Sequence, residues 1–335
     1  MMSATIKDIA KAAGVSIATV SRVINQLGGY NEETGKRVIA VARELGYRKN
    51  ESARSLVQKT TKTIGIIMPD VATSFYGDIT KGIEDISFEH GYSVILTHAG
   101  SRGSRIRESL NLMGERRVDG LIIVSVELQA EGIELLLSLG IPHILLSTKT
   151  ASEQVPYMKV DDYGAAYTAV KHLIDCGHRF IGMAGADPED AIAGVPRMEG
   201  YKQALSDCGL KVDSHVIKTG DFSFDAGKRA MQAFIEEQAP ITAVFCVSDE
   251  AALGIISACY ERGIRVPDDI SVVGYDNSKV SQMSIPPLTT VAQPLYEMGR
   301  AGCLELIRSI QGKTNIVSKV IPHELVIRQS VRKIL

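Results

Sequence analysis

The sequence lacks the segments that would place it in or across a membrane. No apolar run approaches the roughly 18 residues of a spanning helix. The N-terminus also lacks a basic stretch followed by an apolar one, which is the layout of a secretory signal peptide. We therefore expect a cytoplasmic protein without a membrane partner. The length of 335 residues and the 45% apolar content are typical of a globular chain of two or three domains.

Cysteine is sparse and carries no recognisable spacing. The five cysteines are scattered and odd in number, and no two of them form a C-x-x-C pair. This pattern argues against a zinc site and against a disulfide framework. We expect reduced, buried thiols and no metal ligands.

Motifs of common enzymes are also missing. The chain contains no G-x-G-x-x-G, no Walker loop, no G-x-S-x-G and no metal-spaced cluster of histidine and cysteine. Its seven histidines are dispersed. Carboxylates at strand ends and a histidine leave a sugar-processing enzyme as an alternative. We predict a protein that is not an enzyme and needs no cofactor.

Charge is distributed unevenly along the chain. Residues 1–60 hold ten Lys and Arg against five Asp and Glu, whereas the remainder holds 27 basic and 34 acidic residues. A basic head on an acidic body indicates that the head alone meets a polyanion such as DNA.

Within this head, the segment Thr5–Asn25 has the pattern of two short helices joined by a glycine turn. Thr5 and Asp8 have the spacing of a capping box at the start of the first helix. Gly14 suits the positive φ of a tight turn, and Ser16 can cap the second helix. The segment predicts a helix-turn-helix, with an ordinary helical hairpin as the alternative.

The second predicted helix, 17–25, has two different faces. Val20, Val23 and Ile24 form the inner face. The outer face is small and rich in hydroxyl groups, and it includes a single arginine, which favours a DNA major groove over a protein core. Its residues are Ile17, Ala18, Thr19, Ser21, Arg22 and Asn25. A third helix, 32–45, would close this small domain.

Residues 47–57 predict a helix too short to be stable alone. Asn50 can cap it, and Ala53, Leu56 and Val57 share one stripe. Because such a helix must be ordered by a partner, we expect its twin in a dimer, or DNA, to order it.

From Thr63 onward, short apolar strands alternate with amphipathic helices. This alternation predicts an α/β fold of two doubly wound parallel-sheet lobes with a cleft between them. Ligands of such sheets bind beyond the carboxyl ends of the strands. That rule nominates Asp70–Tyr76, Ala99–Arg102, Ser125, Ser147, Ala186–Arg197, Asp221-Phe222, Ser248-Asp249 and Asp276-Asn277. Their mixture of aromatic, charged and hydroxyl groups suits a sugar or a nucleobase.

Two motifs make the head resemble the LacI/GalR family of bacterial transcription repressors. They are T-I-K-D-I-A…G-V-S-x-A-T-V-S-R-V-I-N and the following N-x-x-A-R-S-L. The body is similar to the same family along nearly its whole length, most clearly at R-V-P-D-D-I-S-V-V-G-Y-D-N (265–277), P-L-T-T-V (287–291) and Q-P (293–294).

The resemblance implies a periplasmic-binding-protein-like body below a helix-turn-helix head. The expected domains are the head at 1–47, a hinge helix and linker at 48–60, and an effector-binding and dimerisation body at 61–335. Within the body, the first lobe would comprise 61–160 and 293–321, and the second 161–292 and 322–335. The chain would cross between lobes near 160, 292 and 321.

The resemblance also assigns the DNA contacts. Ile17, Ala18 and Arg22 would face base edges. Thr5, Ser16, Thr19, Ser21, Asn25 and Tyr47 would contact the DNA backbone. Asn50, Ala53, Arg54 and Leu56 would form the hinge element, with Leu56 as an apolar wedge in the minor groove. Packing of Leu56 against the body is the alternative. Lys49 replaces the proline that usually precedes the hinge asparagine.

For the effector, the resemblance points to Phe75, Tyr76, Arg197, Phe222, Ser248, Asp249, Asp276 and Gln293. We add Ser147, where the family often has a carboxylate, and Asp161 at the start of the second lobe. Structural alternatives stay open: Phe75 as core, Arg197 as a surface ion pair with Glu199 or a neighbour, Asp249 as a helix cap and Asp276 as a turn cap. Thr73-Ser74 and Ala193 also depart from the family pattern.

The expected function is sequence-specific repression by a homodimer on a pseudo-palindromic operator, controlled by a small-molecule effector such as a sugar. No leucine-heptad tail follows the body, so we expect a dimer rather than a tetramer. Alternatives are a purine- or nucleoside-responsive repressor and a catabolite-control regulator with a phosphorylated carrier protein as co-effector, since Q-P-L-Y-E-M-G (293–299) resembles that subgroup. A solute-binding protein would share the body, but the basic head opposes it.

Overall fold

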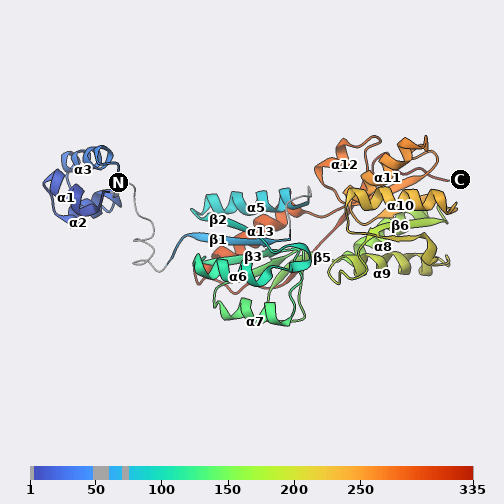
Figure 1. Ribbon diagram of the computed structural model, residues 1–335, viewed down its shortest axis with the longest axis horizontal. Helices are drawn as coiled ribbons and strands as arrows, with labels where there is room; N and C mark the ends of the chain where they lie inside the picture. The colour runs from blue at the N-terminus through green and yellow to red at the C-terminus, as the bar shows by residue number, and fades with distance from the viewer. Residues whose placement is uncertain (1–3, 48–59, 70–74, 335) are drawn as a thin grey trace. The chain divides into compact units, whose positions relative to one another are not determined.

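The chain divides into two compact units, which are described separately. The computed structural model describes residues 4–47, 60–69 and 75–334 (Figure 1). The head comprises residues 1–61 and the body residues 62–335. The predicted hinge residues Asn50, Ala53, Arg54 and Leu56 lie outside the described residues. Across the described chain, no helix is both long enough and apolar enough to cross a bilayer.

The head contains three helices, α1 (Ile6–Ala13), α2 (Ile17–Ile24) and α3 (Glu32–Glu44). Thr5 and Asp8 form a complete capping box, and Gly14 adopts a φ of 65° at the end of α1. The Ser16 side chain accepts a hydrogen bond from the Thr19 amide at the start of α2. The helix-turn-helix prediction is confirmed in its helices and its turn.

A small core holds these helices together. Its fully or almost fully buried members include Ile9, Val20, Val23 and Val38, which come from all three helices. The predicted inner residue Ile24 packs against this core and is partly buried. Val20, Val23 and Ile24 of α2 therefore face inward, which leaves the opposite face of the helix to solvent.

The body is built on two six-stranded sheets. The first has the order β11-β5-β4-β3-β1-β2, and the second has the order β12-β10-β9-β8-β6-β7. All neighbours described in register are parallel except β10 and β12. The strands of the first sheet are β1 (Thr63–Met68), β2 (Ser93–His98), β3 (Gly120–Val124), β4 (His143–Leu146), β5 (Tyr157–Val160) and β11 (Lys319–Ile321). Those of the second are β6 (Ile181–Ala186), β7 (Ile217–Thr219), β8 (Ala243–Cys246), β9 (Ser271–Asp276), β10 (Thr289–Ala292) and β12 (Glu324–Val326).

Helices cover both faces of each sheet, as Figure 1 shows. In β1, Ile64 and Ile66 belong to a core with α5 and α13, whereas Ile67 belongs to a core with α6 and α7. The side chains of a strand alternate between faces, so both faces of this sheet are buried. The first-sheet helices are α5 (Phe75–Glu89), α6 (Ile106–Glu115), α7 (Ala130–Ser138) and α13 (Leu295–Ile310), with the short η1 (Ser101–Gly103). The second-sheet elements are α8 (Asp162–Asp175), α9 (Gly194–Asp207), α10 (Phe224–Glu236), α11 (Asp249–Glu261), α12 (Lys279–Met283) and η2 (Ser214–Val216).

The chain passes between the two sheets three times. It leaves the first sheet after β5, returns to it after β10, and leaves again after β11. We call the two halves the first and the second lobe. The predicted fold class, two doubly wound parallel-sheet lobes with a helix-turn-helix head, is confirmed.

Two glycines let α5 and α13 approach closely. A Cβ atom on Gly82 would lie 2.2 Å from the Tyr296 carbonyl oxygen, and one on Gly299 would lie 2.2 Å from the Ile79 carbonyl oxygen. Both neighbours are backbone atoms, which cannot rotate away. These glycines therefore fix the spacing between the two helices.

We expect Gly82→Ala to lower the free energy of unfolding by about 3 kcal/mol, because the helices must separate to admit the methyl group. Gly77→Ala on the same helix is the control, since a Cβ atom on Gly77 would have no described neighbour within 4 Å. Alanine there should be neutral or stabilising by up to about 1 kcal/mol. Urea unfolding of both variants measures the difference, and equal effects would contradict the close-approach explanation.

Candidate functional site

The body contains a cavity of about 460 Å³ at the carboxyl ends of strands from both sheets. This volume lies within the range of about 300–1,000 Å³ that is typical of small-ligand sites. Pro69 follows β1, Ser125 follows β3 and Ser147 follows β4 on the first-lobe side. Asp187 follows β6 and Asp276 ends β9 on the second-lobe side. The cavity therefore occupies the position that the strand-end rule predicts.

Eight of the ten predicted effector residues line this cavity. They are Phe75, Tyr76, Ser147, Arg197, Phe222, Ser248, Asp276 and Gln293. Two aromatic side chains, Phe75 and Tyr76, meet edge to face, with ring centroids 5.0 Å apart. The structure brings these eight residues together at one site. Their part in effector binding stays a prediction.

Strained backbone is concentrated in the cavity lining. Arg102, Ser125, Ser147, Phe222 and Asp276 all line the cavity and have φ between 50° and 114°. Residues other than glycine rarely adopt this region, and each such residue costs roughly 1–3 kcal/mol. Strain of this kind tends to accumulate where a chain must present groups to a ligand.

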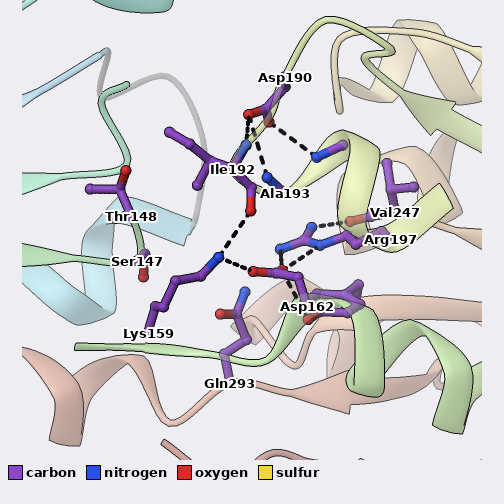
Figure 2. Close-up of polar contacts among 12 residues, drawn as sticks. Ser147, Thr148, Lys159, Asp162, Asp190, Ile192, Ala193, Arg197, Val247 and Gln293 are labelled. Atoms are coloured by element: carbon purple, nitrogen blue, oxygen red, sulfur yellow. Dashed lines mark hydrogen bonds and ion pairs between the residues drawn. The ribbon is translucent and has the colours of Figure 1, made fainter. Parts of the chain in front are cut away.

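A buried ion-pair centre joins both lobes at the cavity wall (Figure 2). The Asp162 carboxylate lies 2.9 Å from the Lys159 Nζ and 2.7 Å from an Arg197 terminal nitrogen. Lys159 belongs to β5 of the first sheet and also donates to the Ile192 carbonyl oxygen at 2.9 Å. Burial raises the pKa of Asp162, but the charges of Arg197 and Lys159 outweigh it, so the pKa lies below its ordinary value. The carboxylate therefore stays ionised.

Arg197 is held on several sides. Its guanidinium lies 3.6 Å from the centre of the Tyr275 ring and donates to the Val247 carbonyl oxygen. Tyr275 in turn donates its hydroxyl hydrogen to Asp162 at 3.1 Å. The suggested surface pair with Glu199 is therefore wrong, because Arg197 is buried against Asp162 instead. A rigid arginine at this position forms one wall of the cavity.

Asp276 and Gln293 form a second polar pair at the cavity. Gln293 donates from Nε2 to the Asp276 carboxylate at 2.8 Å, and both side chains are buried. Burial raises the pKa of Asp276 well above its ordinary value, against the opposing charge of Arg197. The pair offers carboxyl and amide groups to a ligand.

Two of the predicted effector residues do not line the cavity. Asp161 is exposed to solvent, and its neighbour Asp162 is the buried carboxylate of the ion-pair centre. The helix α8 begins at Asp162, and this second aspartate, not the first, is the buried one. Asp249 is buried behind the lining, where it accepts hydrogen bonds from Ser278 and Thr290.

The predicted alternative for Asp249, a helix cap, is also wrong. Ser248 is the N-cap of α11, and its hydroxyl accepts from the Ala251 amide at 3.0 Å and donates to the Phe222 carbonyl oxygen. Asp249 instead connects α11 to β10 through Thr290, at 2.6 Å, and to Ser278. Its function in the structure is to hold these segments together below the cavity.

Several charged lining residues were not among the ten named effector candidates. Lys159 and Asp162 lie at the passage between the lobes, and Asp190 lies in the loop before α9. A lysine inside the apolar strand Y-M-K-V could have indicated a buried cation, since such a residue needs a partner. Arg102 and Asp190 fell within segments nominated by the strand-end rule but were not among the ten effector candidates.

Cavity-lining ion pairs also connect the lobes near solvent. Arg102, which follows β2 in the first lobe, lies 2.7 Å from Asp187 and also pairs with Glu189, both in the second lobe. The Arg102 side chain is 58% exposed. These contacts therefore lie at the open edge of the cavity.

The predicted DNA-reading residues lie on one helix of the head. Ile17, Ala18 and Arg22 are exposed on α2, and Ile17 is 50% exposed despite its apolar side chain. Of the predicted backbone contacts, Thr5 and Ser16 are exposed, and Thr19, Ser21, Asn25 and Tyr47 are partly buried. Tyr47 also packs against the head core. These assignments stay predictions.

Asp249 should make stability depend on pH in a specific direction. Burial raises its pKa to about 6, although hydrogen bonds from Thr290 and Ser278 oppose this. The folded chain thus binds this proton more tightly than the unfolded chain, whose carboxyl has a pKa of 3.8. Stability is therefore lost as the pH rises from about 4 through 6.

We expect the Asp249→Asn variant not to show this loss of stability with rising pH. Between pH 4 and pH 7.5, the unfolding free energy of the unmodified chain should fall by about 2 kcal/mol relative to the variant. Urea unfolding of both proteins across this range gives the difference. A difference that does not change with pH would show that Asp249 has an ordinary pKa.

Both units of the chain match families of known proteins. Residues 5–50 match the family described as "Bacterial regulatory proteins, lacI family". Residues 61–329 match "Periplasmic binding proteins and sugar binding domain of LacI family". Catabolite control protein A of Priestia megaterium is 37% identical over 99% of this chain and 100% of its own length.

Solved structures give the same result. The Lac repressor dimer bound to operator and the anti-inducer ONPF has a TM-score of 0.86 at 28% identity, over 99% of this chain and 100% of that one. The complex of the transcriptional regulator CelR with cellobiose has a TM-score of 0.74 at 32% identity, over 98% and 99%. The chain therefore belongs to the LacI family, and it is a DNA-binding transcriptional regulator with an effector-binding body, not an enzyme.

Proposed function

We propose that this chain is a repressor that binds a pseudo-palindromic operator as a homodimer in the cytoplasm, and that a small molecule in the body cavity controls this binding. The observation that carries the proposal is the presence of two separate interaction surfaces. One is the exposed face of α2 with Ile17, Ala18 and Arg22, and the other is the strained, polar cavity of the body.

The face of α2 has the chemistry of base readout. Arg22 offers a planar fork of donors that matches guanine in the major groove. Ile17 and Ala18 offer apolar contacts suited to a thymine methyl group. The hydroxyl and amide groups of Thr5, Ser16, Thr19, Ser21, Asn25 and Tyr47 suit the phosphates, which fix register without reading sequence.

The effector is a sugar or sugar derivative in this proposal. Aromatic side chains at the cavity, Phe75, Tyr76 and Phe222, can cover the apolar faces of a ring, and carboxyl groups can accept hydrogen bonds from hydroxyls. The CelR complex contains cellobiose, which gives the same ligand class in a relative of similar fold. A nucleoside is the alternative with the same ring and hydroxyl chemistry.

In this proposal, effector binding in the cavity and DNA binding by the head are coupled through the residues between the two units. We propose the domains 1–47, 48–60 and 61–335, with Asn50, Ala53, Arg54 and Leu56 as a hinge that inserts into the minor groove. A ligand that prefers one arrangement of the lobes shifts the hinge between ordered and melted states. A coupling free energy of about 1–3 kcal/mol is sufficient for regulation of this kind.

The catabolite-control alternative needs a second surface for a phosphorylated carrier protein. Two polar side chains of α13, those of Tyr296 and Arg300, are bonded to other residues of the chain. Tyr296 donates to Asp85 at 3.0 Å, and Arg300 pairs with Glu89 at 3.4 Å. We therefore favour the ligand in the cavity as the controlling signal.

Arg22 should determine base preference. Operators selected from random DNA would be compared with versions carrying one symmetric base change. Arg22→Ala should lose about 1–3 kcal/mol of discrimination at one symmetric position, because a bidentate contact with guanine is removed. Arg37→Ala, an exposed arginine on α3, should keep the preference. Equal weakening on every sequence would make Arg22 a phosphate contact instead.

The body should bind the effector without the head. A thermal-shift screen of metabolites on the full chain identifies stabilising compounds. Calorimetry with residues 61–335 should then give dissociation constants within a few fold of those for the full chain, because the cavity lies wholly in the body. Binding that requires the full chain would refute the model of separate sites.

A further inference from the structure

The charge of the cavity lining distinguishes between classes of effector. The described lining contains eight carboxyl groups and three cationic side chains. The cations are Arg102, Lys159 and Arg197. The carboxyl groups belong to Glu127, Asp162, Asp187, Glu189, Asp190, Asp221, Glu250 and Asp276.

Each of the three cations is already paired with a carboxylate of the chain. Lys159 and Arg197 share Asp162, at 2.9 and 2.7 Å, in a buried centre. Arg102 is paired with Asp187 and Glu189. A phosphate or carboxylate on a ligand would therefore compete with a chain carboxylate that is already in position.

The start of a helix is the other usual place for an anion, because its free N–H groups carry partial positive charge. At α9 this place is filled by Asp190 (Figure 2). Its carboxylate accepts from the amides of Ile192 at 2.8 Å, Ala193 at 3.4 Å and Gly194 at 3.3 Å. The chain thus supplies its own anion where a ligand phosphate would bind.

Two other helices that begin at the lining, α8 and α11, also start with carboxylates. The first residue of α8 is Asp162, and the first residues of α11 are Asp249 and Glu250. At both helix starts the chain therefore already places a carboxylate beside the free N–H groups, and at α11 the lining residue is Glu250. An approaching phosphate would meet like charge, which is costly at a partly buried site.

Asp276 gives the lining a preference for ligands that bear hydroxyl groups. Its carboxyl accepts from the neutral amide of Gln293 at 2.8 Å and lies in the cavity wall. A carboxyl group held in this way accepts hydrogen bonds from the hydroxyl groups of a ligand. The aromatic side chains Phe75 and Phe222 supply apolar surface beside it.

We propose that the cavity selects an uncharged, hydroxyl-bearing ring compound and rejects its phosphorylated or carboxylated forms, with Asp190 as a determinant of this selection. The inference rests on the proposed function, since it concerns the effector of the same cavity. It goes further by excluding sugar phosphates and nucleotides as a class.

The test uses the full chain and matched ligand pairs. Ribose, glucose and adenosine would each be compared with its phosphate monoester by thermal shift and calorimetry at constant ionic strength. At least one neutral compound should bind, and its phosphate monoester should bind at least tenfold more weakly.

Asp190→Asn provides the specific variant, because asparagine can still accept hydrogen bonds from the helix amides but carries no charge. The ratio of the dissociation constants of the phosphorylated and the neutral ligand should be at least threefold smaller for this variant than for the unmodified chain. We call this ratio the gap. Asp213→Asn is the matched control. Asp213 accepts from the His215 amide at the start of η2, and it is not among the lining residues described for the cavity. Its variant should leave the gap unchanged.

Three outcomes would overturn the proposal. Equal or tighter binding of a phosphate monoester would refute the exclusion of anions, while leaving effector binding in this cavity intact. An unchanged gap in Asp190→Asn would remove Asp190 as its determinant. Absence of binding by every neutral and phosphorylated compound would contradict both this inference and the sugar or nucleoside effector on which it rests.

Discussion

The body depends on one buried carboxylate. Asp162 lies where the chain first passes from one sheet to the other, and it binds Lys159 from the first lobe and Arg197 from the second. An unpaired charge at this depth would be strongly destabilising, so the three side chains must fold together. Tyr275 and the Val247 carbonyl then fix the arginine. The shape of the cavity follows from this arrangement, because its polar wall cannot move without breaking the centre.

The two units divide the chemistry of a regulator between them. The head has a conventional core of small apolar residues and leaves one face of α2 to solvent, with Arg22 on it. The body concentrates its strained residues and its carboxyl groups at strand ends, around a cavity. The positive charge of the head matches the polyanion DNA, and the negative charge of the body is compatible with the uncharged ring that we propose as its ligand.

The fold could be predicted from the sequence because it depends on periodic patterns. Capping residues such as Thr5 and Ser16, and apolar strands such as β1, determine local structure by themselves. The cavity could be located by the strand-end rule, but its network could not. Whether Asp161 or Asp162 turns inward depends on the helix start, which sequence patterns fix only to within a few residues. The burial of Lys159 and the bonds of Asp249 depend on segments more than 25 residues away, such as Ile192 and Thr290.

The pairs of Arg102 with Asp187 and Glu189 have a kinetic consequence. They join the lobes at the exposed edge of the cavity, whereas the pairs of Asp162 join them in its buried wall. Dissolved salt weakens ion pairs at an exposed surface and screens buried ones far less. We therefore expect a ligand to enter and leave faster as salt rises, while the wall against which it rests keeps its form. Exchange rate and site geometry are thus controlled by different charges.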